Sequence, residues 1–195
     1  MKSARNFFPL TVLLLVCGLT ASAQTAGDNK EFNKDGLSFS YPSGWAFNDS
    51  SNKDAQKMTF GRTDSEAQIT IFVDRDHMTK TEHIAEAKKV LVDKYVAATM
   101  KSFQAEDPKT TRAPATSEIG GLASEGVEIR ASLGGVPGMA EIQWAVVGER
   151  LVVLTLFGPD QALKKAAPAW DTMRKSIKIE APEPKTPQPS ASPKP

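Results

Sequence analysis

His77 and His83 are the only histidines in the chain, and they are its first candidates for metal binding or proton transfer. The acids Asp74, Asp76 and Glu82 lie close to them, where a predicted strand passes into a predicted helix. Imidazole and carboxylate groups bind Zn²⁺, but histidines six residues apart across a helix start need not face one point. Acids at a helix N-terminus also favour the helix dipole without any metal. We therefore predict no metal site at this cluster.

Other patterns associated with catalysis or cofactor binding are incomplete. Residues Asn33 to Gly36 partly resemble a calcium loop, but Pro42 stands where a bidentate glutamate is needed. Gly121 and Gly126 have phosphate-loop spacing without the lysine and hydroxyl residue that should follow. The sequence has no Gly-x-Ser-x-Gly elbow and no His-Glu-x-x-His pair. We predict a protein that is not an enzyme and needs no cofactor; a Ser/His/Asp triad assembled in space stays open as an alternative.

Three tryptophans are candidates for ligand stacking or for the core. Trp45, Trp144 and Trp170 each lie on an apolar face of a predicted element, which favours burial. We expect Trp144 and Trp170 to meet in the layer between the sheet and the last helix.

A glycine-rich segment is the one candidate contact surface. Residues 133–139 contain three glycines and a proline beside apolar side chains that have no obvious partner. The candidate interaction loop consists of Leu133, Val136, Pro137 and Met139. A mobile turn between two strands is the alternative interpretation.

Residues 1–23 have the pattern of a secretory signal peptide. Basic Lys2 and Arg5 precede a short apolar stretch, and Ala21-Ser22-Ala23 is a typical cleavage site. The expected mature chain begins at Gln24, has no membrane span, and is periplasmic or extracellular. The only cysteine, Cys17, is lost on cleavage, so no disulfide or thiolate site is expected.

Composition divides the remaining chain into three parts. Residues 24–33 are polar and are expected to be flexible, residues 34–180 form one domain, and residues 181–195 are a disordered tail with six prolines. Cleavage removes two basic residues and no acid, so 22 basic residues (24 minus 2) face 23 acidic ones. This balance gives no reason to expect a nucleic-acid partner.

Periodicity predicts mixed secondary structure within the domain. Strands are expected at 37–41, 57–62 and 69–73, followed by a helix that begins with a capping-box pattern at Thr79–Glu82. The predicted apolar stripe of this helix consists of Ile84, Ala87, Leu91, Tyr95 and Phe103.

The period of two returns in the second half of the domain. Strands at 115–119 and 122–131 flank a Gly120-Gly121 hairpin turn, and a strand around 142–146 follows. The stretch 151–157 is apolar on both faces, which predicts a central strand covered on both sides. A last helix, in which Pro168 should cause a kink or a restart, has the predicted stripe Leu163, Ala167, Trp170, Met173 and Ile177. The order predicts an α+β fold, with a mainly antiparallel sheet sandwiched between helices.

The segment Leu37-Ser38-Phe39-Ser40-Tyr41-Pro42-Ser43-Gly44-Trp45, the long helix, the Gly-Gly hairpin and the final Ala- and Trp-containing helix resemble the PsbP-like, Mog-type superfamily. The exported bacterial branch of DcrB or DUF1795 type is the most similar in architecture. The resemblance implies an α/β/α sandwich and a non-catalytic binding or assembly module of the cell envelope, acting through contacts with an unidentified envelope protein. The alternative is a carrier of a small molecule or lipid, which requires an apolar pocket of several hundred Å³ between sheet and helix.

Overall fold

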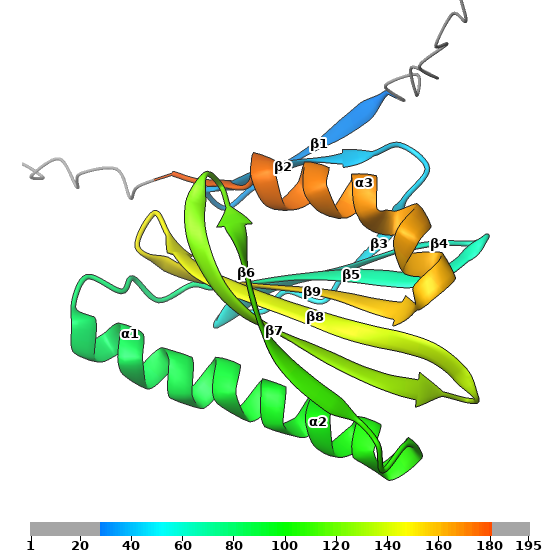
Figure 1. Cartoon of the computed structure of the whole chain (residues 1–195). Helices are drawn as coiled ribbons and strands as arrows, with labels where there is room; N and C mark the ends of the chain where they lie inside the picture. Colours follow the sequence, from blue (N-terminus) through cyan, green and yellow to red (C-terminus); the bar gives the residue numbers. More distant parts are fainter. Residues whose placement is uncertain (1–27, 181–195) are drawn as a thin grey trace, which may run out of the picture.

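The computed structural model describes residues 28–180, and its main feature is a seven-stranded antiparallel sheet (Figure 1). The predicted signal peptide and the predicted tail at 181–195 lie outside the described residues. In spatial order the strands are β3 (Ala46–Asp49), β4 (Ala55–Arg62), β5 (Ser65–Asp74), β9 (Arg150–Pro159), β8 (Val136–Val147), β7 (Leu122–Leu133) and β6 (Thr111–Ile119).

Helices cover both faces of this sheet, as Figure 1 shows. On one face, α1 (Thr81–Ala87), the π-helical segment η1 (Lys88–Asp93) and α2 (Lys94–Glu106) follow one another as one long helix. On the other face lies α3 (Asp160–Ser176), which continues through Pro168. The predicted α+β fold with a sheet between helices is therefore confirmed. The predicted capping box is wrong, because the N-cap is Lys80 and makes no side-chain capping bond.

A second, three-stranded sheet packs beside α3, with the order β1 (Asn29–Lys34), β2 (Leu37–Pro42) and β10 (Lys178–Ile179). The expected flexible segment at 24–33 is wrong for residues 29–33, which belong to β1. Phe32 is buried, and its ring stacks on Phe39 with the centroids 4.9 Å apart. One aromatic side chain in a polar segment thus anchors the strand to the core.

Strand β9 is central and covered on both faces, as its apolar sequence predicts. Leu151 and Val153 pack in the cluster under α1–α2, whereas Val152 and Leu154 pack in the cluster under α3. The two clusters form two core layers on opposite sides of one sheet.

The tryptophans are buried, but they are not all in the same layer. Trp45 and Trp170 belong to the layer under α3, and Trp144 belongs to the layer under α1–α2. The expected meeting of Trp144 with Trp170 is wrong, because in β8 it is Ala145 that faces α3. In α3 itself Leu163, Trp170 and Met173 are buried as predicted, and the remaining buried positions are Ala166 and Ala169, not Ala167.

Candidate functional site

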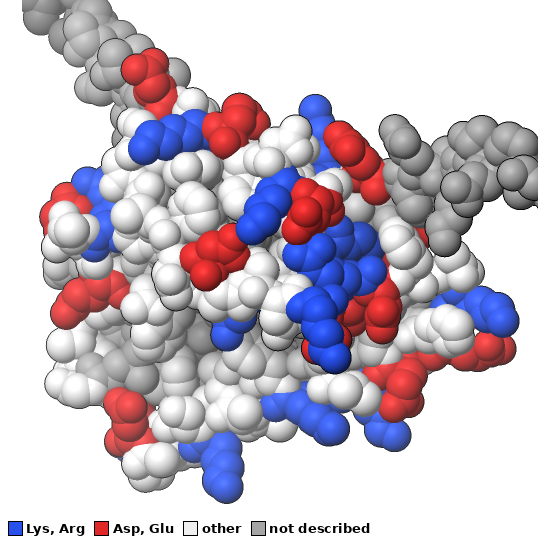
Figure 2. Space-filling view, turned by 180° about the vertical axis from the view of Figure 1, so that it is seen from behind, with Lys and Arg blue, Asp and Glu red and all other residues white. Residues whose placement is uncertain are grey.

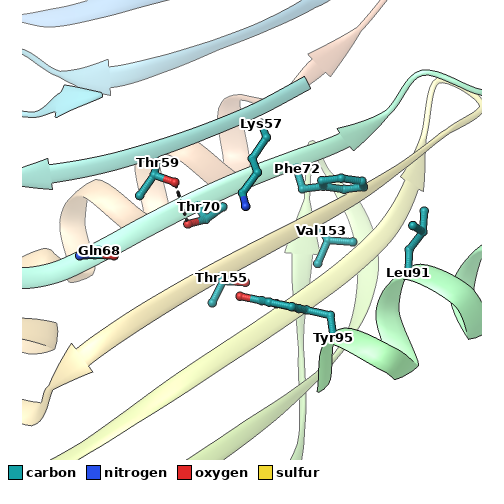
Figure 3. Close-up of a pocket in the computed structure, with 9 residues that line it drawn as sticks. All are labelled: Lys57, Thr59, Gln68, Thr70, Phe72, Leu91, Tyr95, Val153 and Thr155. Atoms are coloured by element: carbon teal, nitrogen blue, oxygen red, sulfur yellow. Dashed lines mark hydrogen bonds between the residues drawn. The ribbon is translucent and has the colours of Figure 1, made fainter. Parts of the chain in front are cut away.

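The helix α1–α2 covers only part of its sheet face, and a groove lies where the cover ends. The helix packs on β7, β8 and β9, so the outward face of β4 and β5 stays open beside it. We call the hollow between them the helix–sheet groove; it has a volume of about 320 Å³ and appears in Figure 3. Its lining residues are Lys57, Thr59, Gln68, Thr70, Phe72, Leu91, Tyr95, Val153 and Thr155.

The floor of the groove follows from strand register. Thr59 pairs with Thr70, and Thr70 pairs with Thr155, so three threonines form one row across β4, β5 and β9. The Thr59 and Thr70 hydroxyl oxygens are 3.4 Å apart. Because side chains alternate along a strand, this row points to the same face as its neighbouring row two residues away.

The neighbouring row combines a cation with apolar side chains. Lys57 pairs with Phe72, and Phe72 pairs with Val153. In Figure 3 the Lys57 side chain points toward Thr70, while Phe72 and Val153 lie on the side of the groove near Leu91. The groove therefore has a polar region and an apolar region.

The π-helical segment η1 determines which helix residues face the groove. A regular helix would continue the stripe from Ala87 to Leu91 and Tyr95, but the wider turn inserts one extra residue. Val92 and Val96 are buried instead, and Tyr95 is 41% exposed. The prediction that Tyr95 is a core residue is wrong for this reason, and Figure 3 shows its ring extending toward Thr155.

The lining of the groove contains a single charged side chain. Lys57 is the only charged residue among the nine that line it. Among the described residues, Lys57 makes no ion pair. On the face seen in Figure 2, basic and acidic side chains are intermixed, without a broad area of one sign.

The two histidines lie apart from the groove, at the start of the long helix. His77 and His83 line a separate open hollow of about 550 Å³ together with Asp74, Asp76 and Glu86. His77 Nδ1 is 3.8 Å from a carboxylate oxygen of Glu149. Within residues 28–180, no three His, Cys, Asp or Glu side chains converge as metal ligands.

The segment proposed as an interaction loop is the tip of a hairpin. Its turn is shorter than expected, with Gly134 and Gly135 between β7 and β8, while Val136, Pro137 and Met139 belong to β8. Val136 is 50% exposed and Met139 packs partly against the core. Leu133 is the last residue of β7. In the calcium-like segment Asn33–Gly36, the first two residues belong to β1 and only Asp35 and Gly36 form the turn to β2.

Arg150 is a buried charge with a structural role. Its guanidinium donates hydrogen bonds to the Asp74 carbonyl at 2.7 Å and to Gln56 Oε1 at 2.6 Å. Burial lowers the pKa of Arg150. These bonds hold the ends of β4, β5 and β9 together, far enough into the protein that the side chain is closed to a ligand.

Similarity to known proteins is confined to structure. The sequence matches no family model and no curated protein. A Bacteroides thetaiotaomicron protein of known structure is 12% identical and has a TM-score of 0.52 over 81% of this chain. The match covers 51% of that protein, so the chain spans about half its length.

Two further solved structures have lower scores. Cyanobacterial PsbP (CyanoP) from Synechocystis sp. PCC 6803 is 14% identical, with a TM-score of 0.47 over 84% of this chain and 100% of that one. LpqN, involved in cell envelope biogenesis of Mycobacterium tuberculosis, is 11% identical, with a TM-score of 0.45 over 80% of this chain and 91% of LpqN. The neighbours thus include a PsbP protein, whereas the narrower DcrB or DUF1795 assignment is not confirmed. At such identities the likeness concerns the fold alone.

Proposed function

We propose that this protein is an exported, non-catalytic binding module of the cell envelope, and that it binds a small molecule in the helix–sheet groove. The observation that carries the proposal is the groove itself, which is open, continuous and lined by apolar and hydroxyl side chains. Its volume of about 320 Å³ lies at the lower end of the range of small-molecule sites, about 300 to 1,000 Å³. This is the feature that a carrier requires and that a purely protein-binding module does not.

The chemistry of the lining favours binding over catalysis. The residues that line the groove include no histidine, cysteine or carboxylate, so the commonest nucleophile–base pairs are absent from the lining. Threonine hydroxyls and a glutamine amide are suited to orienting a ligand by hydrogen bonds. The export part of the proposal is supported by the signal-peptide pattern at residues 1–23. No helix among residues 28–180 has the length and apolar character needed to cross a bilayer.

Protein contact through the β7–β8 hairpin tip is a second candidate function. Val136 and Pro137 are both exposed at this tip. Exposed apolar residues at a hairpin end are suited to contact with an envelope protein, whose identity is open. This candidate predicts that a partner retained from envelope extracts by the wild-type protein is lost with Val136→Asp.

A neutral fluorescent probe, N-phenylnaphthylamine, tests the groove. We expect saturable binding to the wild-type protein, followed by the probe's own emission. Thr70→Trp places a large side chain on the groove floor and is expected to abolish binding. Thr116→Trp is the matched control, because Thr116 is exposed on the far edge strand β6 and does not line the groove.

Thermal unfolding of both variants shows whether each is folded. Wild-type protein that does not bind the probe contradicts the proposal. Equal binding by wild type and folded Thr70→Trp contradicts it as well.

A further inference from the structure

The polar groups of the helix–sheet groove include one cation and no anion. They consist of four hydroxyls, one amide and one ammonium group, contributed by Thr59, Thr70, Thr155, Tyr95, Gln68 and Lys57. All six can donate hydrogen bonds, the hydroxyls and the amide can also accept them, and none carries negative charge. Because Lys57 is the one charge in this lining, the best electrostatic complement is a ligand that accepts hydrogen bonds and carries negative charge at one end.

We propose that the ligand is a small amphipathic carboxylate, held with its head group beside Lys57; this inference rests on the proposed function of the groove. The Lys57 ammonium has no ionic partner within residues 28–180, and Figure 3 shows its chain directed toward Thr70. A carboxylate there receives a charge-assisted hydrogen bond from lysine and further bonds from the threonine hydroxyls.

The apolar part of the ligand has its own place in the groove. Phe72 and Val153 continue the cross-strand row from Lys57 toward the helix, and Leu91 closes that end. The head group beside Lys57 and the apolar part beside Phe72 and Val153 are therefore separated by the spacing of neighbouring strands, about 5 Å for each strand crossed. A chain of a few carbons spans it.

The presence of only one lysine favours a monoanionic ligand over a phosphate group. A phosphate group is commonly held by several cations or by a row of backbone amides, whereas a monoanion is matched by one ammonium and hydroxyl donors. A cationic ligand is disfavoured, because it would lie beside Lys57 with no acid in the lining to offset the repulsion. The lining thus favours a carboxylate over a phosphate or an amine.

Octanoate and octanol test this inference, since they share an apolar chain and differ in the head group. Each is titrated against protein loaded with N-phenylnaphthylamine, and the ratio of the two affinities is measured. In Lys57→Gln we expect octanoate binding to weaken about tenfold relative to octanol, which corresponds to the loss of one charge-assisted hydrogen bond. Lys53→Gln is the matched control, because Lys53 is an exposed lysine of the β3–β4 connection and does not line the groove.

The outcomes separate the two proposals. An octanoate-to-octanol ratio that falls in Lys57→Gln and not in Lys53→Gln supports the inference. If the probe binds but the ratio is the same in wild type and Lys57→Gln, or if octanoate does not displace the probe, the carboxylate inference is wrong while the groove remains a binding site. If the probe itself does not bind, the proposed function fails.

Discussion

The Gly120-Gly121 turn offers a sharp test of how the hairpin β6–β7 packs on the end of α3. Both glycines have positive φ, 57° for Gly120 and 79° for Gly121. They differ in their surroundings. A Cβ added to Gly120 would lie 2.5 Å from the Ile177 carbonyl oxygen, whereas one added to Gly121 would meet nothing within 4 Å.

Alanine substitution at each position separates backbone strain from steric conflict. Left-handed backbone costs an L-residue about 1 to 2 kcal/mol, and both variants incur that cost. Gly120→Ala must also displace the backbone at Ile177, and it endangers the hydrogen bond that the Gly120 amide donates to the Arg174 carbonyl at 2.8 Å. Loss of such a bond adds about 0.5 to 1.5 kcal/mol before any repacking of α3.

Urea denaturation of the two variants measures the difference in unfolding free energy. We expect Gly121→Ala to lose about 1 to 2 kcal/mol and Gly120→Ala to lose at least about 1 kcal/mol more. Equal losses would refute the close contact between the hairpin turn and the α3–β10 junction.

Three further predictions follow from burial, charge and processing. Trp144→Ala and Trp170→Ala should each cost about 3 to 5 kcal/mol in urea denaturation, whereas Trp144→Phe should be much milder, because the buried Trp144 Nε1 has no hydrogen-bond partner among the described residues. Hydrogen bonds from Ser51, together with Lys34, lower the pKa of Asp49 to about 2. The ionised Asp49 carboxylate therefore stabilises the fold fully above its unfolded pKa of 3.8, and this stabilisation is lost as pH falls toward about 2. The unfolding free energy of Asp49→Asn should therefore differ less between about pH 6 and about pH 2 than that of the wild type. An equal difference in the two proteins contradicts this. Intact mass of the exported protein should correspond to a start at Gln24, and a diacylated species starting at Cys17 would contradict the signal-peptide assignment.

Periodicity predicted most of the strands because several of them, such as β2 and β5, alternate clearly between more and less buried residues. The stretch 151–157 gave the central strand, and Gly120-Gly121 gave the hairpin turn. Strand β1 was missed because a single apolar residue, Phe32, carries its burial. A single apolar residue cannot define an alternating pattern, so the strand becomes evident only when Phe32 is seen to pack on β2.

The groove could not be predicted from the sequence, for two physical reasons. The extra residue in η1 moves Tyr95 from the expected stripe to the groove, and a wide helical turn leaves no mark in apolar spacing. Thr59, Thr70 and Thr155 come from three strands, and their row exists only through register. Thr155 is the one hydroxyl residue in the apolar stretch 151–157, and it is the sequence signal that could have pointed to this face.

Mapping the bound probe by NMR tests most directly whether the helix–sheet groove is a binding site. Amide spectra of isotope-labelled protein are recorded during titration with N-phenylnaphthylamine. We expect the largest shift changes at Thr59, Thr70 and Thr155 in the floor of the helix–sheet groove and at Tyr95 on its helix side. Changes confined to the hairpin tip around Val136, or no changes at saturating probe, would contradict it.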